Sequence, residues 1–338
     1  MRRTVSPAQI AAGLVALLVV AGVVLYLVPS NDYIFLPDRA HPVSPLVRVQ
    51  GGRPAKGPGG IYFVDVFERR ASVLESLFPF IRSGSTLVPA GEIVPPCSTD
   101  QQVRRSDLRE MTMSQQVAAA VALRRLGYHV GAVPDGVIVT ALDLGSNATC
   151  KLQPDDVITS LDGAPTPTIP VLQEALGRLR PGATVTVGVE RGTQKLTFRI
   201  KTIKNPFDPA RAIIGFTPDQ AAKITLPVHV RIDAGNVGGP SAGLAFALQI
   251  MEALGKHVDH GYRVAATGEM KLDGTVAAIG GVKQKTFGAR DAGADVFLVP
   301  AAGDNAAQAR RYAHGLKIIA VKTFPQALRA LATLPPKR

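Results

Sequence analysis

The hydrophobic positions of this chain follow three successive patterns along its length, and each pattern predicts a different structure. Residues 10–28 form an apolar stretch that no charged residue interrupts. A helix rises about 1.5 Å per residue, so this stretch reaches roughly 28 Å, close to the hydrocarbon thickness of a bilayer. The first pattern therefore predicts a transmembrane helix at 10–28.

Flanking charges predict how this helix is oriented. Arg2 and Arg3 precede it, and Asp32 is the first charge that follows. Basic flanks stay in the cytoplasm, so residues 1–9 are expected to be cytoplasmic and the rest exported to the outer face of the cell membrane. The alternative is a cleaved signal peptide ending near Ala21. The apolar run continues beyond Ala21 to residue 28, which favours a retained single-pass anchor.

Residues 29–127 show a weaker and mixed pattern. Residues 29–58 are rich in Pro, Gly and Arg, and they predict a stalk that leaves the membrane. A β-rich run at 60–67 predicts a strand, and helical spacing at 72–81 predicts a helix. Thr112 and Gln115 match a capping box that opens a helix at 113–126. We expect 29–127 to pack against the C-terminal domain.

The second pattern, an alternation of apolar and polar residues typical of strands, dominates residues 128–203. Strands are predicted at 136–142, 155–163, 185–189 and 196–200, with a short helix at 171–179. After a Pro-rich linker at 205–209, the third pattern predicts helices that alternate with strands. Helices are predicted at 240–254, 282–292, 305–313 and 325–334, and strands at 226–232, 263–271, 275–279, 296–300 and 317–321. The fold class is therefore α/β or α+β, with a separate β-rich unit at 128–203 and an α/β domain at 204–338.

Composition narrows the function. The 338 residues carry a net charge of +12, but the basic residues are scattered and lack interleaved aromatic residues, so nucleic-acid binding is not expected. Six dispersed His and two Cys offer no CxxC or HExxH motif, so neither a metal nor a cofactor is predicted. Cys97 and Cys150 lie in loops, and outside the cytoplasm they can form a disulfide. The alternative is two separate buried thiols.

One segment has the pattern of a nucleophile site. Gly238 and Gly239 permit a sharp turn, Pro240 suits the start of a helix, and Ser241 follows immediately. Backbone N–H groups from residue 238 to 241 would then form an oxyanion hole. A helix N-cap is the structural alternative for Ser241.

This serine needs a base, and a lysine can serve if burial lowers its pKa. Lys283 and Lys285 both lie at the start of an otherwise small and apolar helix. Glycine, valine and alanine surround Lys285 at helical spacing, so Lys285 is the better candidate. The alternative is a solvated surface lysine.

These motifs resemble known families. GVIVTAL (136–142), PDDVITSLDG (154–163) and PGATVTVGVERG (181–192) resemble a bacterial PDZ domain. The resemblance implies a groove for a peptide end, which adds a strand to the sheet. Gly136, Val137, Leu172 and Leu176 are its candidate lining residues. The alternative is a PDZ unit that acts only as a spacer or lid.

The motifs GGPSAG (238–243), TGE (267–269), IGGVKQK (279–285) and DVFLVP (295–300) resemble the proteolytic domain of Lon protease. The resemblance implies a Ser-Lys dyad of Ser241 and Lys285, with Thr267 hydrogen-bonded to the lysine. Many Lon enzymes have Asp where this chain has Gly238, a difference that we expect to leave the site less self-blocked.

The order of anchor, PDZ unit and Lon-like domain resembles membrane-anchored, PDZ-containing Lon-like proteases of bacteria. No G-x-x-x-x-G-K-[ST] motif is present, so an ATP-independent endopeptidase acting on exported or membrane polypeptides is expected. The resemblance also implies a homo-oligomer, with a hexamer as the first hypothesis. Two rivals are a small-molecule kinase, with phosphate held by the Gly-Gly-Pro-Ser turn, and a catalytically inactive PDZ receptor or scaffold.

Overall fold

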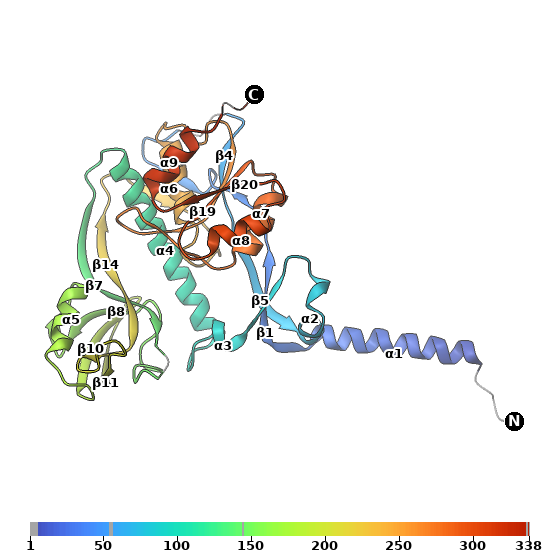
Figure 1. Cartoon of the computed structure of the whole chain (residues 1–338), viewed down its shortest axis with the longest axis horizontal. Coiled ribbons are helices and arrows are strands. Elements are labelled where there is room, and N and C mark those ends of the chain that lie inside the picture. Colours follow the sequence, from blue (N-terminus) through green and yellow to red (C-terminus); the bar gives the residue numbers. More distant parts are fainter. Residues whose placement is uncertain (1–5, 54–56, 144, 336, 338) are drawn as a thin grey trace.

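The computed structural model describes residues 6–53, 57–143, 145–335 and 337, so Arg2 and Arg3 lie outside the described residues. Helix α1 (Pro7–Leu27) projects from the body (Figure 1), and none of its residues is buried. Its first turn is closed by a capping box between Ser6 and Gln9. Among the described helices, α1 alone is long and apolar enough to cross a membrane.

The segment after α1 is a strand, so the expectation of a stalk at 29–58 is wrong. β1 (Pro29–Pro37) pairs antiparallel with β5 (Val66–Ser72) on one side and with β6 (Thr86–Pro89) on the other. Only Tyr33 and Ile34 of β1 are buried, which explains why its sequence lacks a clear alternation. β5 forms one edge of this three-stranded sheet.

A five-stranded sheet forms the centre of the C-terminal domain. Its order is β2 (His41–Pro42), β4 (Gly60–Phe63), β16 (Arg263–Ala266), β19 (Val296–Pro300) and β20 (Lys317–Val321). All but β2 run parallel. Residues from before and after the PDZ-like unit therefore share one sheet, and the single strand expected at 60–67 is instead divided between β4 and β5.

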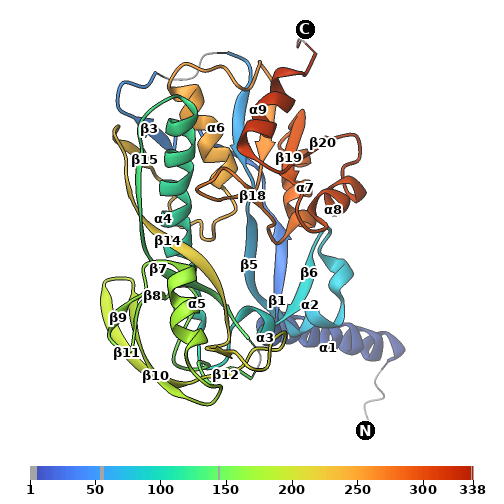
Figure 2. The same ribbon diagram turned by 60° about the vertical axis from the view of Figure 1, so that its left-hand side comes forward.

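Helices cover both faces of this sheet (Figure 2). One face packs against α4 (Asp100–Arg125), α6 (Gly243–Ala253) and α9 (Phe324–Ala332). The other face packs against α7 (Val282–Asp291) and α8 (Asn305–Arg311). Successive strand residues point to opposite faces, so Val264 and Ala266 enter the first core while Ala265 enters the second.

Two helices differ from their predicted bounds. α4 begins with a capping box between Thr99 and Gln102, and not at Thr112 as predicted. Thr112 lies inside the helix, where its hydroxyl donates to the carbonyl of Leu108 at 3.0 Å. The helix expected at 72–81 is a short α2 (Val73–Leu77) followed by the 3₁₀ turn η1 (Pro79–Ile81), because Pro79 cannot donate a helical hydrogen bond. A further short helix is α3 (Ala90–Ile93).

The PDZ-like unit is a second sheet with its own core. The sheet order is β11 (Gln194–Lys201), β10 (Thr184–Arg191), β8 (Val157–Leu161), β7 (Gly131–Leu142) and β14 (Phe216–Thr225), and β9 (Ala164–Pro165) pairs with β8. Helix α5 (Ile169–Gly177) covers the core. The sequence did not predict β14, which continues this sheet beyond residue 203.

Chain connectivity makes the PDZ-like unit an insertion in the C-terminal domain. The chain enters it along β7 after α4 and leaves along β14, and these two strands pair antiparallel over their length (Figure 2). Small pairs complete the fold: β3 (Val47–Val49) with β15 (Val230–Ile232), β12 (Ile203–Lys204) with β13 (Ala212–Ile213), and β17 (Glu269–Met270) with β18 (Val276–Ala277).

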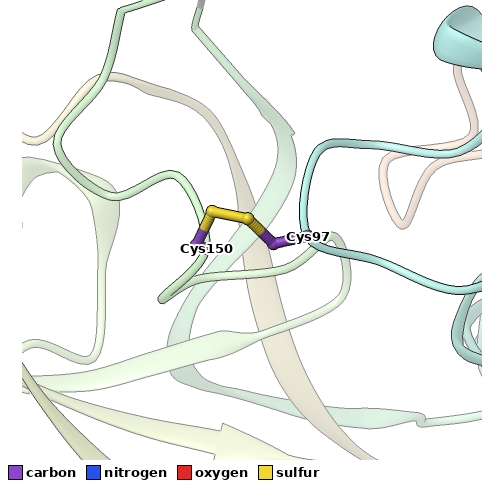
Figure 3. The surroundings of a disulfide bond; sticks show 2 residues. All are labelled: Cys97 and Cys150. Atoms are coloured by element: carbon purple, nitrogen blue, oxygen red, sulfur yellow. A yellow bond between two sulfur atoms is a disulfide. The ribbon is translucent and has the colours of Figure 1, made fainter.

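Cys97 and Cys150 are joined by a disulfide (Figure 3). Their Cα atoms are 5.1 Å apart, and 53 positions separate them in the sequence. The bond connects the loop before α4 to the PDZ-like unit. It therefore fixes a second point of attachment for the inserted unit, in addition to the β7–β14 ribbon.

Candidate active site

The loop before α6 holds Ser241 in a fixed position. The helix predicted from residue 240 begins at Gly243, so Ser241 precedes its first turn by two residues. Helix α4 supports the loop from one side: the Ser114 hydroxyl donates to the Pro240 carbonyl at 2.9 Å, and the Gly239 N–H donates to the Asp107 carbonyl at 2.8 Å. Gly239 has a φ of 80°, a conformation that favours glycine.

Two glycines permit this close approach of α4. A Cβ at Gly243 would lie 2.9 Å from the Ser114 hydroxyl and 3.1 Å from the Met270 nitrogen. A Cβ at Gly238 would lie 2.6 Å from the Cβ of Asp107. A side chain at position 238 therefore has no room here, since Asp107 already occupies the adjacent space.

Lys285 contacts Ser241 from helix α7. It lies in the first turns of α7, and its Nζ donates to the Ser241 Oγ at 2.7 Å. Lys285 is only 4% exposed. The structure therefore brings the predicted serine and lysine into direct hydrogen-bonding contact across 44 positions of sequence.

Burial lowers the pKa of Lys285 to about 8, because the charged ammonium loses its hydration. The nearby carboxylate of Asp65 opposes this effect, since a negative charge favours the protonated lysine. The net result is an amine that loses its proton near pH 8, well below the range of a solvated lysine and within reach of general-base catalysis.

Lys283, the other lysine of the same motif, has a different environment. Its Nζ donates to the backbone carbonyl of Ser85 at 2.6 Å. The next residue, Gln284, donates to the Gly84 carbonyl and to the Thr86 hydroxyl. These residues join α7 to the segment around β6, whereas Lys285 turns toward the serine.

Thr267 supports the serine and not the lysine. Its hydroxyl donates to the Ser241 carbonyl at 3.1 Å, and the N–H of Gly268 donates to the same oxygen at 2.8 Å. The expected hydrogen bond from Thr267 to Lys285 is therefore replaced by one that holds the backbone of the nucleophile loop.

The loop offers fewer oxyanion donors than the sequence indicated. Pro240 has no N–H, and the N–H of Gly239 is engaged by Asp107. Among the hydrogen bonds of the described residues, the N–H groups of Gly238 and Ser241 have no acceptor. These two groups remain available for a developing negative charge.

A cleft of about 720 Å³ opens at the serine and the lysine. It lies between the edge strand β5, the N-terminal half of α4 and the nucleophile loop. Its lining residues include Tyr33, Phe35, Asp65, Val66, Phe67, Glu68, Arg69, Arg104, Asp107, Val237, Gly238, Ser241 and Lys285. An extended polypeptide can lie in such an open groove beside an unpaired strand edge.

A cluster of titratable side chains near the dyad could not be predicted from the sequence. His41 Nε2 lies 3.6 Å from a carboxylate oxygen of Asp38 and 3.7 Å from one of Asp65. The imidazole nitrogen and one oxygen of each carboxylate all lie within 4.8 Å of one another. An ionised Asp65 carboxylate raises the pKa of Lys285, while burial raises the pKa of Asp65 itself. The only available signal was an aspartate within the β-rich run at 60–67.

The four residues predicted to line a PDZ groove lie on or beneath an occupied edge. Leu172, Leu176 and Val137 are buried in the PDZ core, and Gly136 pairs with Ala221 of β14. β14 lies along β7 and contacts α5, so the chain itself occupies the edge at which a peptide was expected to bind.

The side chain of Gln220 holds β14 at this edge of the PDZ-like unit. Its Nε2 donates at 2.9 Å to the carbonyls of Gly136 and Pro167, and its Oε1 accepts from the N–H of Ile169 at 3.3 Å. The side chain thus bridges β7 and the start of α5.

Comparisons with known proteins agree with this organisation. A model of the Lon protease (S16) C-terminal proteolytic domain matches residues 210–333, and a PDZ domain model matches residues 121–202. Lon protease of Mesomycoplasma hyopneumoniae is 35% identical over 124 residues, which cover 34% of this chain and 14% of that protein. Lon protease 2 of Bacillus subtilis is 38% identical over 111 residues, covering 32% of this chain and 19% of that protein.

The PDZ domain of an SdrC-like protein from Listeria monocytogenes is a similar solved structure. It is 24% identical, with a TM-score of 0.23, and the match covers 25% of this chain and 87% of that one. The chain spans less than a fifth of the length of the two Lon relatives.

The matches and the fold together define a class, a mixed α/β protein with a proteolytic domain of Lon type. Within that class, the chain combines the Lon proteolytic domain with an inserted PDZ domain and an N-terminal helix long enough to cross a membrane.

Proposed function

We propose that this chain is a membrane-anchored serine endopeptidase that hydrolyses peptide bonds with a Ser241–Lys285 dyad and without ATP. The observation that carries the proposal is the 2.7 Å hydrogen bond from a buried lysine to the serine hydroxyl. A buried amine with a pKa of about 8 is roughly one-tenth neutral at pH 7 and about half neutral at pH 8, so it can accept the serine proton.

The reaction proceeds in two halves. Neutral Lys285 takes the proton of Ser241 as its Oγ attacks the substrate carbonyl, and the N–H groups of Gly238 and Ser241 receive the oxyanion. The lysine then gives its proton to the leaving amine, which breaks the peptide bond and leaves an acyl-serine. Water, deprotonated by the same lysine, releases the acid product and restores the serine.

The site favours an extended polypeptide substrate. The edge strand β5 and the nucleophile loop both line the cleft, so a substrate strand that pairs with β5 would present a carbonyl to Ser241. With α1 in the membrane and its N-terminus in the cytoplasm, the cleft lies on the exported side. Polypeptides of that compartment or of the membrane are the proposed substrates.

The PDZ domain takes part in recognition only when β14 leaves its edge. A free chain end competes with a strand that is covalently attached and already hydrogen-bonded, so substrate recruitment through this domain requires release of β14. A homo-oligomer, with a hexamer as the first hypothesis, also remains part of this proposal. Sedimentation as a strict monomer would contradict the oligomer.

The receptor hypothesis competes with this proposal, because a PDZ scaffold requires no dyad. The discriminating experiment incubates the detergent-solubilised full chain with unfolded casein and no nucleotide. We expect cleavage by the wild type, and losses on the order of 10³-fold or more for Ser241→Ala and Lys285→Ala.

Lys283→Ala is the matched control, since Lys283 belongs to the same motif but contacts Ser85. It should retain cleavage per folded molecule. The wild-type rate should rise as the pH passes through about 8, when Lys285 loses its proton. Cleavage by Ser241→Ala at the wild-type rate would refute the dyad. A folded wild-type chain that cleaves no polypeptide would favour the receptor hypothesis.

A further inference from the structure

A short apolar segment beside the anchor is unusually exposed. Residues 77–81 (Leu-Phe-Pro-Phe-Ile) form the end of α2 and the turn η1, and we refer to them as the apolar turn. Phe80 is 81% exposed, Leu77 59%, Ile81 51% and Phe78 43%. Single exposed apolar residues are common, but four in one turn form a patch that marks an interaction surface.

The apolar turn lies next to the point where α1 joins the body (Figure 1). The N–H of Val73, the first residue of α2, donates to the carbonyl of Val28 just beyond α1 at 2.9 Å. Arg82, immediately after the turn, donates to the Tyr26 hydroxyl in the last turn of α1 at 3.3 Å. The patch is thus continuous with the exposed apolar surface of the helix end.

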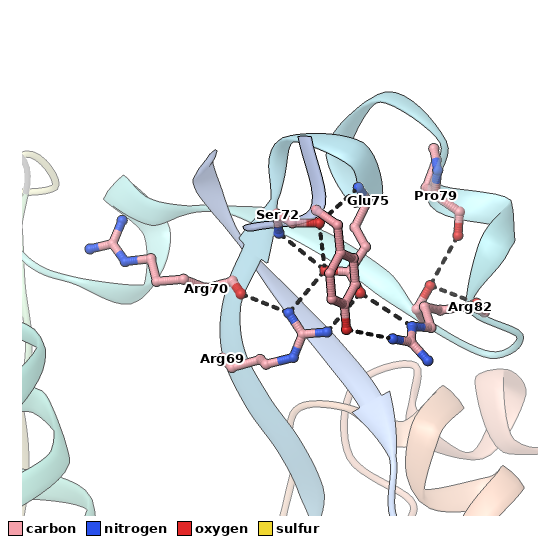
Figure 4. Close-up of polar contacts among 8 residues, drawn as sticks. Arg69, Arg70, Ser72, Glu75, Pro79 and Arg82 are labelled. Carbon is pink, nitrogen blue, oxygen red and sulfur yellow. Dashed lines mark hydrogen bonds and ion pairs between the residues drawn. The ribbon is translucent and has the colours of Figure 1, made fainter. Parts of the chain in front are cut away.

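An ion cluster around the buried carboxylate of Glu75 fixes the turn in this position. The Glu75 carboxylate accepts from Arg69 at 2.6 Å and from Arg82 at 3.2 Å, as Figure 4 shows. The same side chain closes a capping box with Ser72. These contacts hold the pKa of Glu75 at about 2, so the cluster stays charged at any physiological pH. Glu75 lies two residues before the apolar turn and Arg82 immediately after it, so their ion pair holds the two ends of the turn together.

We propose that the apolar turn inserts into the interfacial layer of the bilayer that holds α1. This inference rests on the proposed membrane anchoring. Burying aromatic and aliphatic side chains removes apolar surface from water, and interfacial segments use this energy to lie on membranes. Arg82, whose side chain is 43% exposed, is placed to meet anionic headgroups at the same depth.

A contact between the apolar turn and the bilayer would fix the orientation of the cleft. A chain held by one helix can rotate about it, whereas two contacts fix its orientation. β1 and β5, which line the cleft, connect directly to α1 and α2. The cleft is therefore held at a constant height and angle, which favours substrate segments close to the bilayer surface.

The chain contains no tryptophan, so one introduced tryptophan reports its own environment. The full chain would be placed in vesicles of phosphatidylcholine and phosphatidylglycerol, with and without bromine on the acyl chains. We expect emission from Phe80→Trp to be blue-shifted and strongly quenched by the brominated lipid. Leu17→Trp, within α1, should be quenched as well.

Phe207→Trp is the matched control, because Phe207 is 97% exposed and belongs to the PDZ-side loop. It should show no quenching. Quenching of Leu17→Trp without quenching of Phe80→Trp would overturn the apolar-turn contact while the anchor stands. Quenching of neither would refute both. Protection of Phe80→Trp from aqueous acrylamide without lipid quenching would assign the patch to a second copy of the chain instead.

Discussion

At the residue scale, the candidate site depends on one lysine being kept away from water. Its position could be predicted from sequence, because small and apolar neighbours surround Lys285 at helical spacing. The role of Thr267 could not, since its choice between two acceptors depends on the distance between segments that are remote in sequence. Asp65 was missed for the same reason: its influence on Lys285 exists only once β4 and α7 are packed together.

Burial of the lysine has a cost in stability that can be measured. Below pH 8 the ammonium is protonated in both the folded and unfolded states, and the full desolvation penalty applies. Between about pH 8 and 10.5 only the unfolded state holds the proton, so stability rises with pH in this window. A shift of this size corresponds to on the order of 3 kcal/mol.

We therefore expect Lys285→Met to be more stable than the wild type at pH 7, by roughly 1–3 kcal/mol because the lost hydrogen bond offsets part of the gain. The difference should vanish near pH 10.5. Urea unfolding of both chains at the two pH values, followed by circular dichroism, measures it. Lys283→Met is the control and should lose stability at both pH values. A Lys285→Met chain that is less stable at pH 7 would contradict the burial argument.

At the element scale, regular patterns identified most helices and strands, and local ambiguity explains the errors. Thr99–Gln102 and Thr112–Gln115 carry the same capping signal, and only the first begins a helix. β14 contains Pro218 and exposes much of its length, so it lacks the alternation typical of a strand. Its strand character comes from pairing with β7, which single-sequence reasoning cannot detect.

The place of β14 on the PDZ edge predicts that Gln220 controls access to it. Gln220→Glu keeps the side-chain shape but sets a carboxylate against the carbonyls of Gly136 and Pro167. Losing the hydrogen bonds that this amide group donates costs at least about 1.4 kcal/mol, so amide exchange in β14 should become about tenfold faster or more. Hydrogen exchange of the full chain, read on peptides covering 216–225, measures this change.

Lys223→Gln provides the control within the same strand, because Lys223 is exposed and makes no hydrogen bond or ion pair through its side chain among the described residues. Its exchange should match the wild type. Gln220→Glu should also bind C-terminal peptides more tightly than the wild type, since the edge is open for a larger fraction of time. Unchanged exchange in Gln220→Glu would mean that main-chain pairing alone holds β14.

At the scale of the whole molecule, the proteolytic domain is built from two distant parts of the chain. β4 and β16 pair directly, as do Ile61 and Val264, although the PDZ domain lies between them in sequence. The two domains could be predicted from their motifs. The arrangement of the two domains relative to each other could not be predicted, because it depends on the β4–β16 pairing, on β14 and on the disulfide between Cys97 and Cys150.

That link predicts how the PDZ domain is held beside the cleft. Closing a loop of this length removes conformational freedom from the unfolded chain, and such bonds typically contribute about 2–4 kcal/mol. Cys97 and Cys150 both have positive φ values, 63° and 67°. Serine bears the same backbone strain, so substituting both cysteines with serine isolates the contribution of the bond.

The double serine variant should therefore lose about 2–4 kcal/mol in urea unfolding, and the reduced wild type should match it. Casein cleavage at low urea should persist, because neither cysteine lines the cleft or contacts Ser241 or Lys285. Hydrogen exchange should become faster in the PDZ domain and in the first turns of α4, which the bond joins. Equal stability of the variant and the oxidised wild type would show that the β7–β14 ribbon holds the inserted domain alone. Lost cleavage in a folded variant would show that the placement of the PDZ domain governs the dyad.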